Sequence, residues 1–272
     1  MARYKIQYKP KLSKNQAKDK ICAHAMFGNH GNDLRPKSPE EAQEYFLQKG
    51  VNTDILVEQC RDYKKFVPDF ENLIGSTWQT VDASVSLIDS DKEVINEMKE
   101  PGLFIWSNCE AHFEAACDAR DRAVDKVSYS AFQECLSQGF ASIEAFFSAQ
   151  ARFWNKQHPD NELIGSETHK VSLEDKIEEW VPKMSNGKKI DKTGKVWNDF
   201  KILKKARGDN AIHPKLPGQG ISYRALAKQI NGFRLWIAQL LANLHLLLGL
   251  PVPSIIINAV HMPEVEVIKV QE

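Results

Sequence analysis

One heptapeptide in the second half of the chain brings an arginine and a histidine close together in sequence, Arg207-Gly208-Asp209-Asn210-Ala211-Ile212-His213. A guanidinium group offers a fixed fork of hydrogen-bond donors that can hold a phosphate. A neutral imidazole can take a proton from a ribose hydroxyl near pH 7. Arg207 and His213 are therefore candidates for cutting RNA without a metal ion.

The element that carries this pair is predicted to be a helix that ends at or near His213, because Pro214 follows at once. Six residues of ideal helix turn the chain by about 600°, which would place the two side chains roughly 120° apart. They meet only if the helix loosens between them, and Gly208 and Asn210 are residue types that permit this. An arginine and a histidine at this spacing also occur by chance in many chains, so the surrounding sequence has to decide.

The segment that leads into the heptapeptide is basic. Residues 181–215 contain ten lysines or arginines and three aspartates, whereas the whole chain of 272 residues has a formal net charge of zero. A charge run of this kind is either a solvated helix face or a surface that meets phosphates. On the second interpretation Lys204, Lys205 and Lys215, which flank the Arg–His pair, are the predicted RNA-binding residues.

Composition and cysteine usage predict a cytoplasmic protein. The five cysteines include no C-x-x-C pair and are widely spaced, which favours reduced thiols. The N-terminus lacks the apolar run of a secretory signal, and the most apolar stretch, residues 235–250, is too short for a bilayer. Cys22, His24 and His30 lie near one another without a regular zinc spacing, so neither a metal site nor a cofactor is expected.

The first part of the chain, residues 1–105, predicts a mixed but mostly helical region of unassigned fold. Alternating Tyr4, Ile6 and Tyr8 indicate a short strand, and the polar stretch that follows it, with glycines at 28 and 31, reads as a loop. Ser38 begins a helix that ends near Gly50. Two or three more short helices are expected between residues 53 and 100.

Residues 106–253 predict a mainly α, antiparallel helical bundle. One long helix or two abutting helices are expected over about 107–157. Further helices are expected from Ser172 to about Trp180, up to the heptapeptide, and over about 226–248. On the helix that ends at the heptapeptide, Trp197, Phe200 and Leu203 are predicted to face inward. The tail, residues 254–272, is predicted to contain two short strands, at 254–257 and 265–270.

Four pieces of this second region carry a resemblance to a known family: QECLSQGFASIEAFFSAQARF (133–153), LEDKIEEWVPKMSNGKKIDK (173–192), VWNDFKILKKARGDNAIHPK (196–215) and ISYRALAKQINGFRLWIAQLLANLHLLLGLPVP (221–253). Together they resemble the HEPN superfamily, whose members are small helical bundles. In that family an arginine, four to six residues and then a histidine mark the end of one core helix. The resemblance covers about residues 106–253, and here the motif ends the third of four amphipathic helices.

The resemblance implies a metal-independent endoribonuclease that needs no cofactor. It also implies a homodimer in which two Arg–His motifs face each other across a shared cleft, and a role in toxin–antitoxin, phage-defence or RNA-processing systems. The implied partners are RNA, a second copy of the chain and, for a toxin, a cognate inhibitor protein; no membrane is involved. Carried over to this chain, Arg207 would hold the scissile phosphate and His213 would be the general base.

One position departs from the family pattern. The residue after the arginine is usually polar in the family, often Asn, Asp or His, whereas here it is Gly208. Asp209 or Asn210 would then supply the supporting group from one or two positions later, so the predicted catalytic set is Arg207, Asp209, Asn210 and His213. The alternative is a catalytically inactive HEPN module that dimerises and binds RNA or a nucleotide.

Overall fold

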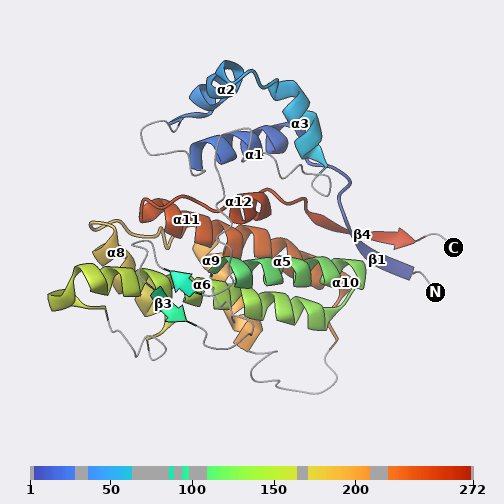
Figure 1. Cartoon of the computed structure of the whole chain (residues 1–272). Helices are drawn as coiled ribbons and strands as arrows, with labels where there is room; N and C mark the ends of the chain where they lie inside the picture. Colours follow the sequence, from blue (N-terminus) through green and yellow to red (C-terminus); the bar gives the residue numbers. More distant parts are fainter. Residues whose placement is uncertain are drawn as a thin grey trace.

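The structure is a computed structural model that describes residues 3–27, 36–62, 86–88, 94–97, 109–163, 171–208 and 220–270, with backbone only for 86–88 and 94–97. Within these ranges the chain is mainly helical with two pairs of short antiparallel strands, as the sequence predicts for the fold class (Figure 1). No helix in the described ranges has both the length and the apolar character that a bilayer crossing requires.

Three N-terminal helices form a layer of their own, drawn in blue in Figure 1: α1 (Lys14–Phe27), α2 (Pro39–Gln48) and α3 (Thr53–Arg61). The predicted start at Ser38 is confirmed, because its Oγ accepts a hydrogen bond from the Glu41 N–H at 3.2 Å. Gly50, just past α2, has φ +72°, a backbone conformation that favours glycine. A small core of its own, including Ile21, Phe46 and Leu56, holds the layer together.

Helix α1 was not predicted, since the stretch after the first strand reads as polar. Its buried positions include Lys20 and His24 alongside Ile21 and Cys22, so the helix lacks a clean apolar stripe. A second correction concerns residues 53–100: α3 is helical as expected, but Ser86–Ile88 (β2) and Val94–Glu97 (β3) form an antiparallel strand pair where helices were predicted.

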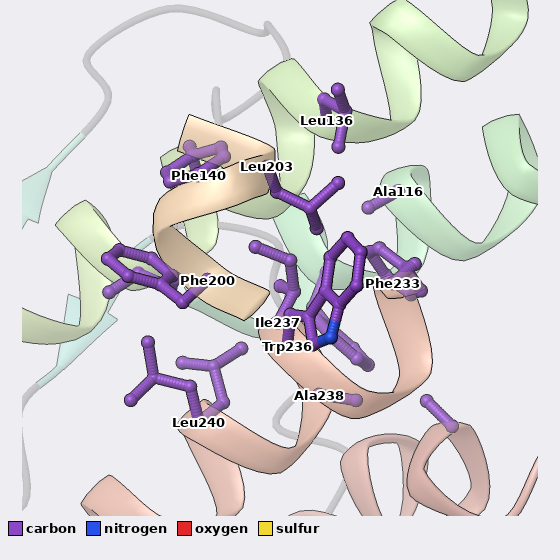
Figure 2. Packing of buried hydrophobic residues seen from close by; sticks show 14 of the residues in the cluster. Ala116, Leu136, Phe140, Phe200, Leu203, Phe233, Trp236, Ile237, Ala238 and Leu240 are labelled. Carbon is purple, nitrogen blue, oxygen red and sulfur yellow. The ribbon is translucent and has the colours of Figure 1, made fainter. Parts of the chain in front are cut away.

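The central body is built on a helical hairpin, α5 (Cys109–Asp125) and α6 (Tyr129–Gln157), closed by a three-residue connection. Against it pack α9 (Lys195–Arg207) and one long helix made of α10 (Tyr223–Phe233), the π-helical turn η7 (Arg234–Ala238) and α11 (Gln239–Leu247). The predicted inward face of α9 is confirmed. Figure 2 shows Phe200 and Leu203 in one cluster with Phe140 of α6 and Ile237 of η7.

Two glycines let the long helix approach its neighbours closely. A Cβ on Gly139 of α6 would lie 3.2 Å from side-chain atoms of Phe233 and Ile237, which is tighter than most real contacts. A Cβ on Gly232 would lie 2.2 Å from the six-membered ring of Trp236, so that indole rests directly on the helix backbone. The π-helical turn and Gly232 together seat Trp236 in the core at 4% exposure.

The helix that begins at Ser172 extends further than predicted. It runs as α7 (Leu173–Asp175), the π-helical turn η5 (Lys176–Trp180) and α8 (Val181–Met184), although an end was expected near Trp180. Pro182 lacks an N–H, which removes one bond from an α-helical ladder. The wider π-helical turn just before Pro182 lets the chain stay helical. The helix then ends at the predicted turn, where Asn186 and Gly187 both have positive φ. A 3-10 turn, η3 (Pro159–Asn161), follows α6.

The two ends of the described chain meet in one sheet. The predicted strands at both termini are confirmed as β1 (Arg3–Tyr8) and β4 (Val265–Val270), which pair antiparallel with Tyr8 opposite Val265. The predicted strand at 254–257 is wrong, because these residues begin the helix α12 (Ser254–Val260). Figure 1 shows α12 between the N-terminal layer and the central body.

Candidate functional site

The site predicted from the sequence begins at the last residue of α9. Trp197, Phe200 and Leu203 bury one face of this helix in the core, with exposed fractions of 2% or less. That anchoring fixes the direction in which α9 delivers its final turn. Arg207 closes the helix and Gly208 follows with helical angles, φ −61° and ψ −48°. The described part of α9 therefore remains wound through Gly208, where the sequence suggested that it could loosen.

Arg207 is held against the neighbouring helix α6. Its guanidinium carbon Cζ lies 4.9 Å from the centre of the Phe140 ring, and Phe140 itself is 1% exposed. A guanidinium over an aromatic face is attracted by the ring quadrupole and loses side-chain freedom. Arg207 is half-buried. The arginine is therefore restrained at the rim of the bundle and is not free to swing in solvent.

Four of the predicted site residues lie outside the described residues. They are Asp209, Asn210, His213 and Lys215, all within 209–219. Convergence of the His213 and Arg207 side chains therefore remains a prediction.

The basic run is partly neutralised by acids of a different helix. The Lys204 ammonium forms an ion pair with the Glu174 carboxylate of α7, and Lys192 pairs with Glu178 of η5. Lys205, one residue further along α9, is exposed. Lys205 is thus better placed than Lys204 to meet a phosphate, although the predicted RNA-binding role of both is untested.

The thiols of the central body are poor nucleophiles. Burial raises the pKa of Cys109 and of Cys117 to about 12, and it raises the pKa of Cys135 well above its usual value. All five cysteines of the chain are free thiols. Because the thiolate is the reactive form, the raised pKa values disfavour these thiols as nucleophiles near neutral pH.

The described ranges hold no cluster of three or more His, Cys, Asp or Glu side chains that could bind a metal ion. His24, one of the residues weighed as a ligand, is 3% exposed, and its Nε2 lies 3.0 Å from Asn258 Oδ1. This hydrogen bond ties α1 to α12, so His24 acts as a core residue that joins the N-terminal layer to the central body.

Sequence reasoning missed two residues that shape the site. These residues are Phe140 of α6 and Glu174 of α7. Their contacts with Arg207 and Lys204 span 67 and 30 positions, so no local pattern could reveal them. The one usable signal is chemical: a helix with acids in its first turn is a suitable neighbour for a basic one.

Comparison of the chain with protein-family models, with curated proteins and with solved structures finds no match to any of them.

Proposed function

We propose that the protein is a metal-independent endoribonuclease of the HEPN type. The single observation that carries the proposal is the place of Arg207, at the end of a core helix of the bundle and stacked on Phe140, with His213 six residues further along the chain. A restrained guanidinium at the edge of the helical bundle suits a substrate that presents one phosphate at a time.

The proposed reaction follows from the two side chains. His213 accepts the proton of a ribose 2′-hydroxyl, and that oxygen attacks the adjacent phosphorus while the bond to the 5′-oxygen of the next nucleotide breaks. Negative charge grows on the non-bridging oxygens, where Arg207 binds the transition state more tightly than the ground state. The leaving 5′-oxygen takes up a proton, so the products are a 2′,3′-cyclic phosphate and a 5′-hydroxyl.

The remaining predicted residues would support binding and geometry. Lys205, an exposed residue two positions before Arg207 in α9, would contact a flanking phosphate, together with Lys204 and Lys215. Asp209 or Asn210 would orient His213, a role that Gly208 cannot fill because it has no side chain. In the proposed homodimer a second copy lines the other side of the cleft, in a toxin or phage-defence setting.

The test uses the purified full-length chain, end-labelled RNA and excess EDTA. Cleavage with 2′,3′-cyclic phosphate ends is expected, and the same sequence made with 2′-O-methyl riboses should stay intact because it lacks the attacking hydroxyl. RNA that shifts in a gel without being cut would overturn the enzyme and favour the inactive binding module. Cleavage of the 2′-O-methyl strand would overturn the mechanism.

A further inference from the structure

A groove that the ribonuclease proposal does not use lies at the first turns of α9, at the other end of that helix from Arg207. It has a volume of about 650 Å³. One face of α10 and η7 forms its floor, the first turns of α9 form one wall, and β4 forms the other. The π-helical turn under this floor is a form of helix that occurs often at functional sites.

The β4 wall is the edge of that strand that does not pair with β1, and α10 covers the edge at its first residue, Val265. Val265 has both backbone groups bonded to the Asn231 side chain of α10: its N–H donates to Oδ1 at 2.7 Å and its C=O accepts from Nδ2 at 2.9 Å. Glu264, one residue earlier, faces the opposite way, since its C=O accepts from the Lys9 N–H at 2.8 Å. Because backbone groups alternate along a strand, Val267 also points its N–H and C=O away from β1 and toward the groove.

Asn231 therefore stands where the first peptide group of a third strand would stand. Its carboxamide offers the same donor and acceptor as a backbone amide and pairs with Val265 in the same way. Beyond it, the edge at Val267 continues along the groove. An open edge of this kind is a template for pairing with another extended chain.

The floor and the α9 wall of the groove each contain one buried polar atom that has no hydrogen-bond partner among the described residues. Trp236 is 4% exposed and its indole Nε1 has no hydrogen-bond partner among the described residues. The Oδ2 atom of Asp199 in α9 is also buried and without a partner there. Buried polar atoms are normally paired, and the two residues that carry these atoms, one a donor and one an acceptor, both belong to the lining of the groove.

The rim of the groove favours an acidic ligand. Lys195 of α9 and Arg224 and Lys228 of α10 are all exposed at it. Two acids, Asp199 and Glu266, also line the groove, so cations are in excess. Ala227, Leu235 and Val267 supply apolar surface between the charges. An extended chain with alternating apolar and acidic residues would match this arrangement, since successive side chains point to opposite faces.

We propose that this groove binds an extended, acidic polypeptide segment, which adds to β4 as a third strand. A polypeptide in the extended form carries donors and acceptors on both of its edges, so one edge can pair with Val267 while the other edge faces the α9 wall. The proposal does not depend on whether the chain cuts RNA.

Three labelled peptides of identical length test the proposal by fluorescence anisotropy with the full-length chain. The probe is an eight-residue peptide of alternating valine and glutamate, and the first control replaces every glutamate with lysine. The second control keeps the valine–glutamate sequence but methylates every backbone nitrogen, which removes the N–H donors and retains the charge. We expect the probe to bind at least tenfold more tightly than either control.

Two protein variants place the peptide in the groove. Lys228→Glu should weaken binding of the probe peptide at least tenfold. Lys18→Glu, the same charge reversal at an exposed position of α1, should leave binding of the probe unchanged. Val267→Pro removes one backbone N–H that points away from β1, and it should also weaken binding of the probe peptide. The proposal is overturned if the methylated peptide binds as well as the probe, if Lys228→Glu has no effect, or if the probe fails to bind at about 1 mM.

Discussion

Arg207 and Phe140 are in contact across two helices, with the guanidinium carbon 4.9 Å from the ring centre. The contact joins the last residue of α9 to the middle of α6, where the Phe140 side chain is almost completely buried. Its value to function is positional, because the proposed phosphate-binding group is held at the edge of the bundle before any substrate arrives.

A double-mutant cycle on this pair measures how strongly the ring holds the arginine. Phe140→Leu should lower the free energy of unfolding by about 1–3 kcal/mol, because it shortens a buried side chain that also packs on Phe200. Combined with Arg207→Ala, the two changes should show a coupling of about 0.5–1 kcal/mol, the range of a cation–π contact. Urea unfolding of the four proteins gives the value, and strictly additive effects would show that the contact contributes nothing.

Gly232→Ala tests the close packing of the Trp236 ring against the helix backbone at Gly232. The new methyl group would collide with the indole ring at 2.2 Å, so the ring must move or the helix must bend. We expect the free energy of unfolding to fall by about 1–3 kcal/mol, as for other overpacked cores. In the background Trp236→Leu, which removes the colliding ring atoms, the same glycine change should cost much less. Equal losses in both backgrounds, measured by thermal or urea unfolding, would contradict the close packing.

Arg120 should be among the most sensitive positions for stability, because it joins three parts of the chain. The side chain is fully buried in α5, and its guanidinium donates to Tyr8 Oη at 3.0 Å and to the Pro263 C=O at 3.3 Å. Arg120→Ala should cost about 3 kcal/mol or more, since it leaves a cavity and unpaired acceptors. Arg122→Ala is the control: Arg122 lies two residues further along α5 and pairs with Glu134 at the surface, so the change should cost under about 1 kcal/mol.

Acid should destabilise the protein through His261, which follows α12. Burial lowers the pKa of this imidazole to about 4, and the nearby Lys20 ammonium contributes in the same direction. His261 in the unfolded chain binds a proton below about pH 6.5, whereas in the folded chain it binds one only near pH 4. The free energy of unfolding therefore falls as the pH drops from about 6.5 to about 4.

The variant His261→Asn isolates this effect from other titrating groups. The difference in urea midpoint between about pH 7 and about pH 4 should be smaller in the variant than in the parent, by an amount equivalent to at most about 3 kcal/mol. An unchanged difference would mean that His261 titrates normally in the folded protein.

Sequence reasoning predicts the helices of the central body well because their apolar residues recur at helical spacing, as in α6 and α9. It fails where a buried face is chemically mixed or an apolar run is short. Helix α1 buries Lys20 and His24 and so looks like a polar stretch. The isoleucines at 255–257 favour a strand by type, but Pro253 and the packing of α12 on the central body set a helix instead.

The candidate site is predictable only in part for a related reason. The place of Arg207 at the end of a core helix follows from the pattern of Trp197, Phe200 and Leu203. The Arg207–Phe140 contact and the Lys204–Glu174 ion pair do not follow, because they depend on how whole helices are rotated against each other. The groove beside β4 also arises only from packing, since its lining residues come from distant elements.

The most direct test of the central claim compares RNA cleavage in EDTA by the parent chain and three single variants. His213→Ala should lower the rate by about 10²- to 10⁴-fold, the share of a general base, and Arg207→Ala by about 10²- to 10³-fold. Arg152→Ala, an exposed arginine of α6, is the matched control and should cut like the parent. All four proteins should show the same circular dichroism spectrum. Undiminished cleavage by a folded His213→Ala protein would contradict the proposed ribonuclease site.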